Sequence, residues 1–130
     1  MSAKPETTFT SAVHRHLPKS LYKVKNNNSY TGGIPDCWYS GRRADLWVEY
    51  KFVPKLPAQL TPALTALQLQ WLNARYEEGR NVAVIVGAPA GGVILRNLEW
   101  RNSISRTDFL RKLKSRAELA AWICQEVGCN

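Results

Sequence analysis

Alternating apolar and polar residues mark one strand near the middle of the chain. Residues 45–52 read DLWVEYKF, so every second position from Leu46 onward is apolar or aromatic. This period of two is typical of a strand with one buried face. Side chains two apart on a strand share a face at roughly 6–7 Å spacing. Glu49 and Lys51 are therefore expected side by side, opposite the apolar face.

The same pattern predicts the other elements. An apolar stripe at helical spacing follows Pro5 and Glu6 and ends before Pro18. The clearest helix runs from about Thr61 to Glu78, is closed by Gly79, and carries a predicted stripe of Leu64, Leu67, Trp71 and Leu72. Further helices are expected over 107–113 and 115–127, the second with Ser115 and Glu118 as a capping box.

Strands are predicted over 21–25, 35–40, 82–86 and 93–95. The run Val82–Val86 is continuously apolar, which suits a strand that is buried on both faces. A strand, a helix and a second buried strand in succession indicate a right-handed crossover between parallel strands. Asn26–Gly33 and Pro54–Pro62 are expected to be loops, because both are rich in turn-forming residues.

Size and charge restrict the class of protein. A chain of 130 residues with 45% apolar residues predicts a single domain, 1–130, with one core. The formal net charge of +8 favours a polyanionic partner, nucleic acid before membrane, although a solvated basic surface explains it equally well. The longest apolar run, Val82–Ala90, is far shorter than the roughly 20 residues of a membrane helix.

The cysteines and histidines do not predict a metal centre of their own. Three cysteines without a signal peptide favour a reducing compartment, hence a cytoplasmic protein without a disulfide framework. Their spacing, and that of His14 and His16, does not match a zinc site.

Candidate chemistry gathers around the central strand. Asp36 ends the turn Gly33-Ile34-Pro35-Asp36, upstream of Glu49. Two carboxylates suffice to hold Mg²⁺, with Mn²⁺ as a possible substitute, and the carbonyl of Tyr50 is a further candidate ligand. Lys51 would orient or help to deprotonate an attacking water. The alternative is a solvated strand face, on which Glu49 and Lys51 form a pair that contributes little to stability.

These motifs together resemble the PD-(D/E)XK nuclease superfamily. The resemblance rests on GIPD at 33–36, VEYK at 48–51, the helix segment LTALQLQWL at 64–72, Gly79, and the strand 82–86. In this order they are most similar to stand-alone VRR-NUC nucleases, which occur in phages. The resemblance implies a restriction-endonuclease-like αβββαβ core over about 6–95, a mixed sheet flanked by helices, with extra C-terminal helices over about 105–128.

The resemblance also implies roles for individual residues. Asp36, Glu49, Lys51 and Gln68 are expected to be catalytic, with Asp36 and Glu49 binding metal and Gln68 helping to position the site. Glu6 is the candidate for a further metal contact from the first helix. Asp45, on the Glu49 face, is a rival ligand, although strand-edge solubility or pairing with an arginine explains it as well.

The resemblance implies an Mg²⁺-dependent DNA endonuclease, selective for structure in the manner of a Holliday junction resolvase. Arg42, Arg43 and Lys55 are the expected DNA-binding residues, with the two arginines placed near the cut. Symmetric cutting of a junction needs two active sites, so a homodimer is expected, in the host cytoplasm if a phage encodes it. Alternatives are a non-catalytic nucleic-acid-binding module on the same fold and, less favoured, a protein-interaction domain.

Overall fold

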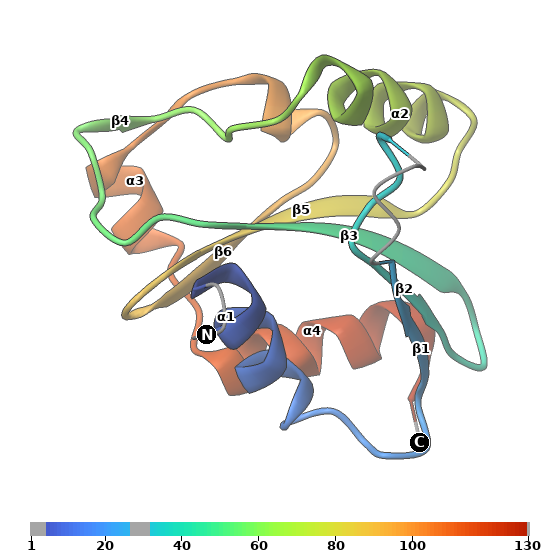
Figure 1. The fold of residues 1–130 in the computed structure, drawn as a ribbon. Coiled ribbons are helices and arrows are strands. Elements are labelled where there is room, and N and C mark those ends of the chain that lie inside the picture. The colour runs from blue at the N-terminus through green and yellow to red at the C-terminus, as the bar shows by residue number, and fades with distance from the viewer. Residues whose placement is uncertain (1–4, 27–31, 130) are drawn as a thin grey trace.

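The computed structural model describes residues 5–26 and 32–129. Its elements are α1 (Pro5–His14), β1 (Tyr22–Lys25), β2 (Cys37–Ser40), β3 (Asp45–Phe52), β4 (Gln59–Leu60), α2 (Ala66–Glu77), β5 (Val82–Ala88), β6 (Gly91–Leu95), the 3₁₀ helix η1 (Glu99–Arg101), β7 (Ile104–Ser105), α3 (Arg106–Arg111) and α4 (Arg116–Val127), as Figure 1 shows. None of the helices in these two ranges is both long and apolar enough to span a bilayer.

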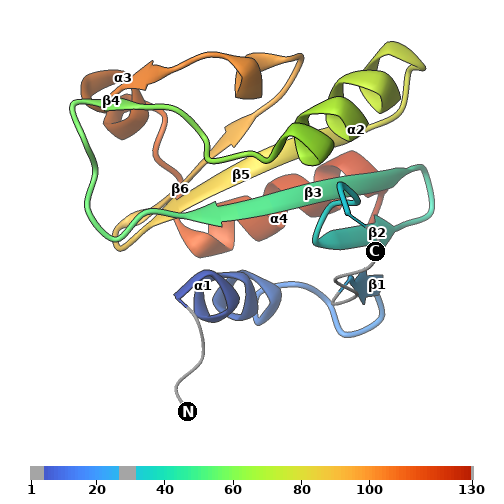
Figure 2. The same cartoon turned by 45° about the horizontal axis from the view of Figure 1, so that its top comes forward.

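A five-stranded sheet organises the chain, in the order β1-β2-β3-β5-β6. Strands β3 and β5 are parallel, as predicted, and the other neighbouring pairs are antiparallel. Helix α2 lies over one face of this mixed sheet, while α1 and α4 lie over the other (Figure 2). The predicted α/β class with a mixed sheet between helices is confirmed.

Strand β3 has the predicted alternation. Leu46, Val48 and Tyr50 are fully buried and join the core made with α1 and α4. Trp47, on the opposite face, packs against the second core, to which α2 contributes. The neighbouring strand β5 is buried along its whole length. A continuous apolar strand is needed there because helices cover both of its faces.

Helix α2 begins later than the sequence pattern predicts. Its first residue is Ala66 rather than Thr61, and Thr65 is the N-cap. The residue before a proline disfavours helical backbone, so Pro62 delays the start. The predicted apolar stripe is also partly wrong: Leu72 is fully buried, but Leu67 is 58% exposed. A start at Ala66 places Leu67 in the first turn of the helix, next to Gly32 and Gly33, where its side chain stays largely exposed.

The C-terminal third completes the core under α1. Helix α4 has the predicted capping box between Ser115 and Glu118, and Leu119, Ile123 and Val127 belong to the core formed with α1 and the sheet. Strand β4 pairs with β7, which adds a two-residue bridge to the predicted loop 54–62.

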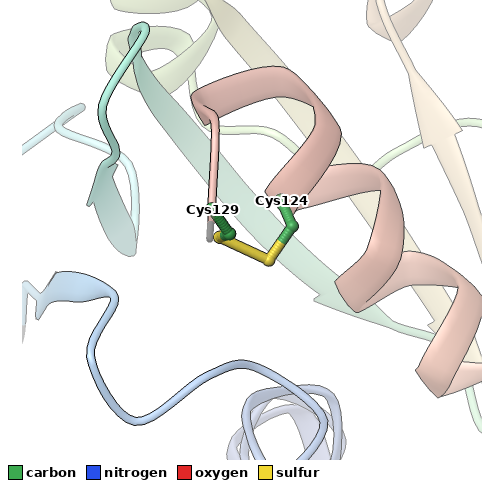
Figure 3. The surroundings of a disulfide bond; sticks show 2 residues. All are labelled: Cys124 and Cys129. Carbon is green, nitrogen blue, oxygen red and sulfur yellow. A yellow bond between two sulfur atoms is a disulfide. The ribbon is translucent and has the colours of Figure 1, made fainter.

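The expectation of no disulfide is wrong for one pair of cysteines. Cys124 and Cys129 are bonded at the end of α4, as Figure 3 shows. Gly128 has a left-handed backbone, and the amides of Gly128 and Cys129 both donate to the Cys124 carbonyl. This turn returns the chain to Cys124, a local approach that cysteine spacing alone does not predict. Cys37 is buried and unbonded to another cysteine.

Candidate active site

Folding brings the two predicted catalytic carboxylates together. Asp36 directly precedes β2, whose first residue, Cys37, pairs with Val48. The next position on β3 is Glu49. The Asp36 Oδ2 accepts a hydrogen bond of 3.0 Å from the Tyr50 amide, which extends the bonding between these strands by one step. The Asp36 carboxyl also lies within hydrogen-bonding reach of the Glu49 side chain. Backbone pairing therefore fixes both acids at one end of β2.

Glu49 is the most unusual charged residue in the core. It is only 2% exposed. Burial raises the pKa of its carboxyl to about 8, and the charge of Asp36 adds to this effect, while Lys51 opposes it. Among the described residues, Glu49 Oε1 is a buried atom that receives no hydrogen bond. The carboxyl of Glu49 is therefore only partly satisfied by the described residues, with a second acid close to it.

The other oxygen of Glu49 is held by two predicted catalytic residues. Gln68 Nε2 donates to Glu49 Oε2 at 3.0 Å, and Lys51 Nζ lies 3.5 Å from the same oxygen. Lys51 Nζ also donates to Gln68 Oε1 at 3.2 Å. Glu49, Lys51 and Gln68 thus form a closed triangle, and with Asp36 they make up what we call the carboxylate site.

Gln68 is positioned by the start of α2 as well as by the site. Its Oε1 accepts from the Thr65 amide at 3.0 Å, and its own amide donates to Thr65 Oγ1 at 3.1 Å. This reciprocal pair is a capping box. The spacing of Thr65 and Gln68 is the signal that sequence analysis missed, and it would have placed both the helix start and the orientation of the amide.

A glycine turn sets the distance between α2 and Asp36. Gly33 has a φ of +91°, and a Cβ built on it would lie 2.7 Å from the Leu67 carbonyl oxygen. Any side chain there would meet backbone, which cannot yield as a flexible side chain can. Gly33 therefore allows the turn that carries Asp36 to pack directly on the first turn of α2.

The remaining predicted metal ligands are less closely gathered. Glu6 lines a small pocket at the start of α1 together with Asp36, and its charge contributes weakly to the raised pKa of Glu49. Within 5–26 and 32–129, no three His, Cys, Asp or Glu side chains form a group able to hold a metal ion. Asp36 and Glu49, with a buried oxygen that lacks a donor, fit a cation that also takes backbone or water ligands. The Tyr50 carbonyl is of that kind.

The predicted DNA-binding residues lie apart from the carboxylates. Arg42 and Arg43 are in the β2–β3 turn, at the opposite end of β2 from Asp36, and their amides donate to carbonyls at the end of α4. Four residues of strand place them roughly 13 Å away. Lys55 is exposed in the loop after β3. The rival ligand Asp45 accepts a hydrogen bond from Ser40 at 2.8 Å, also at the far end of β3.

A second buried polar group lies on the opposite face of β3. The hydroxyls of Tyr39 and Tyr50 are 2.6 Å apart, and Tyr39 Oη lies 2.7 Å from His14 Nε2. Burial, aided by Lys23 and Lys25, lowers the pKa of His14 to about 4. We call these three residues the tyrosine chain. Sequence analysis did not find it, because its members come from three elements and no spacing links them.

Comparison with solved structures identifies the architecture. The chain is similar to Hjc, a Holliday junction resolvase from the archaeal hyperthermophile Archaeoglobus fulgidus, with a TM-score of 0.58. The match covers 91% of this chain and 97% of that chain at 18% sequence identity. The chain has the restriction-endonuclease-like fold. In this fold α4 and α1 cover one face of the sheet and α2 covers the other. No family model and no curated protein matches the sequence.

Proposed function

We propose that this protein is a metal-dependent DNA endonuclease that cuts branched DNA. One observation carries the proposal: the buried Glu49 carboxyl lies close to Asp36 and has one oxygen that receives no hydrogen bond from the described residues, while Lys51 and Gln68 hold the other oxygen. Burying the Glu49 carboxylate beside the half-buried Asp36 is costly unless a cation joins them. A nuclease-like fold with this arrangement is best explained as a phosphodiesterase.

The residues would divide the work as follows. Asp36, Glu49 and the Tyr50 carbonyl would hold Mg²⁺, or Mn²⁺ in its place, and Glu6 would add an outer contact. When bound, the metal would supply a more acidic water and neutralise charge on the phosphate. Lys51, whose side chain is 18% exposed, would orient the attacking water or, in its neutral amine form, help to deprotonate it. Gln68 would hold the side chains of Glu49 and Lys51 in position relative to each other, because its amide group bonds to both.

The substrate proposal rests on charge and on the structural relative. A net charge of +8 suits a polyanion, and a solved structure with a similar fold is a Holliday junction resolvase. We propose branched DNA as substrate, a homodimer that makes paired cuts, and action in the cytoplasm, in a host cell if a phage encodes the protein. The VRR-NUC type remains the sequence-based hypothesis.

Cleavage of defined DNA tests the proposal. A four-way junction, a flap and a plain duplex of matched sequence would be incubated with the protein and Mg²⁺ or Mn²⁺, with EDTA as the control. We expect the branched DNAs to be cut in preference to the duplex. Failure to cut any of the three with either metal would contradict the nuclease proposal.

A binding module on the same fold would give a different result. A Lys51→Ala variant should bind the junction as the unmodified protein does but cut it much more slowly. A variant that binds equally and cuts no less would mean that Lys51 has no catalytic role. The remaining cleavage would then come from a contaminating nuclease, and the protein would be a non-catalytic DNA-binding module.

A further inference from the structure

A row of aromatic rings runs from the edge of the sheet to the carboxylate site. Its members, which we call the aromatic row, are Tyr22 on β1, Trp38 on β2, Trp47 on β3 and Trp71 on α2. Ring centroids are 5.6 Å apart for Tyr22 and Trp38, 5.9 Å for Trp38 and Trp47, and 5.3 Å for Trp47 and Trp71. The row is therefore continuous across four elements.

The row and the site share one face of the sheet. Trp38 pairs directly with Trp47 across β2 and β3, and cross-strand partners point to the same face. Trp47 is two residues before Glu49, so the two side chains share that face, roughly 6–7 Å apart along the strand. A nucleotide whose phosphate lay at Glu49 and Lys51 would have its neighbouring base within reach of the rings.

The rings are open to solvent where the helix does not cover them. Helix α2 packs along β5, and β1 and β2 extend beyond it (Figure 2). Tyr22 is 60% exposed and Val24, on the same face of β1, is 41% exposed, while the three tryptophans are half-buried. Tyr22 pairs with Ser40, at the end of β2 away from Asp36, so the exposed ring is connected to the candidate active site through the tryptophans of the row. Exposed aromatic side chains that continue towards such a site are an expected feature of a binding surface.

Charge favours a nucleic-acid occupant of this surface. The Arg75 guanidinium lies 5.8 Å from the Trp71 ring centroid at the α2 end of the row. Lys51 lies on the same strand face as Trp47, beside Glu49. Both cations lie towards the α2 end of the aromatic row, near the carboxylate site, and cations beside aromatic rings suit a ligand that combines flat rings with phosphates.

The exposed area is too small to favour a second copy of the chain. A stable protein interface buries about 800 Å² on each partner. Among the described residues of this surface, Tyr22 and Val24 are the well-exposed large apolar side chains, and Lys23 and Lys25 alternate with them on the same short edge strand. Lysines on an edge strand discourage pairing with another strand.

We propose that the aromatic row binds unpaired nucleobases at the branch point of the DNA substrate. A base inside a duplex has its faces covered by its neighbours, whereas an unpaired base can stack on an aromatic side chain. This inference rests on the proposed function, since it describes where the DNA next to the cut phosphate lies. It makes the row a determinant of selectivity for branched over continuous DNA.

The test compares two branched duplexes that differ only in two unpaired nucleotides at the branch, which carry adenines in one and are abasic in the other. Affinities would be measured in EDTA, so that nothing is cut. We expect the full-length protein to bind the adenine form roughly tenfold more tightly, the effect of about one stacked base. Tyr22→Ala should reduce this preference severalfold, while Tyr22→Phe, which keeps the ring, should retain it.

A control variant and a fluorescence measurement separate the possible outcomes. Leu110→Ala, which alters a side chain 50% exposed on α3, is the matched control and should leave the preference unchanged. 2-Aminopurine at the unpaired position should change in fluorescence on binding, less so with Tyr22→Ala or Trp38→Leu. If no preference for adenine exists, or if Tyr22→Ala converts a dimer to a monomer, the inference is overturned.

Cleavage of the same DNAs with Mg²⁺ keeps the two proposals distinct. Cutting without any preference for unpaired bases would remove the role of the aromatic row and leave the nuclease proposal standing. A preference for unpaired bases without any cutting would support the role of the aromatic row and contradict the nuclease proposal.

Discussion

The two faces of β3 each carry a buried polar cluster, and the clusters differ in whether their atoms are satisfied. In the tyrosine chain, the hydroxyls of Tyr39 and Tyr50 and the His14 ring are linked by bonds of 2.6 and 2.7 Å. In the carboxylate site, Glu49 keeps one oxygen without a donor and faces another acid. A complete network stabilises a fold, whereas an incomplete one indicates a ligand.

The energetic consequences differ in the same way. Burial raises the pKa of the Tyr39 hydroxyl and lowers that of the His14 ring, so both stay neutral at physiological pH. Neutral groups with partners cost little to bury. The Glu49 carboxyl, with a pKa raised to about 8, is poised to lose its proton when a cation arrives. The comparison predicts that mutations on one face affect activity and those on the other affect stability.

The largest expected effect is on cleavage. Glu49→Gln and Lys51→Ala should each lower the rate of junction cutting by about 10³-fold, comparable to the loss of a group that stabilises transition-state charge. Single-turnover cleavage with Mg²⁺ measures this. Junction affinity in EDTA is the control and should change little. Cutting within tenfold of the unmodified rate would show that the carboxylate site is not catalytic.

The pH dependence of stability comes next. The Glu49 pKa is raised from 4.5 to about 8, so its contribution to metal-free stability is full below pH 4.5 and is lost as pH rises through 8. Relative to Glu49→Gln, the unmodified protein should lose on the order of 3 kcal/mol between pH 5 and pH 9. Urea unfolding in EDTA measures the difference, and parallel curves for the two proteins would contradict it.

Added Mg²⁺ should reverse this loss. At pH 9 the carboxylate is already ionised, so binding displaces no proton and should raise Tm more than it does at pH 6. Asp36, Lys51 and Glu6 are the charged groups that affect Glu49, and a matched series with Asp36→Asn would show whether both acids are required. An equal Tm shift at both pH values would argue against Glu49 as a ligand.

The tyrosine chain gives a smaller effect of a different kind. Tyr39→Phe removes the shared hydroxyl and leaves both His14 and Tyr50 without this partner, which should cost about 2 kcal/mol of unfolding free energy. The rate of cutting at 25 °C should stay within twofold, since the variant remains folded. A large loss of cutting by a fully folded Tyr39→Phe variant would mean that the two faces of β3 are functionally coupled.

The smallest effect is expected at Asp45. Its contact with Ser40 is exposed and lies at the far end of β3 from Glu49. Asp45→Asn should therefore change unfolding free energy by less than about 0.5 kcal/mol and leave cutting unchanged. A substantial loss of Mg²⁺-dependent cutting would restore Asp45 as a rival metal ligand.

The sequence predicted those parts of the site that depend on the local periodicity of apolar residues and on the order of the elements. A period of two was enough to place Glu49 beside Lys51, and the order of elements was enough to pair β3 with β5 in parallel. It did not predict the start of α2, because a stripe that begins at Leu64 favoured a helix from about Thr61, and the exposed Leu67 shows that this stripe was partly misread.

What could not be predicted depends on contacts between distant segments. The end of α4 supports the β2–β3 turn through hydrogen bonds to Arg43 and Ala44, and no spacing in the sequence links these segments. For the same reason, placing Arg42 and Arg43 near the cut was an inference from their position between two acids along the chain. The turn instead carries them to the opposite end of β2.

The close approach of Gly33 to Leu67 has a consequence for recognising relatives of this protein. An acid, a second acid and a lysine occur by chance in many chains, but a residue without a β-carbon, set three positions before the first acid and against the opening turn of a helix, is a far rarer coincidence. Searches that demand this steric constraint together with the glutamine of that turn should separate true homologues from accidental matches more sharply than the short charged motif does.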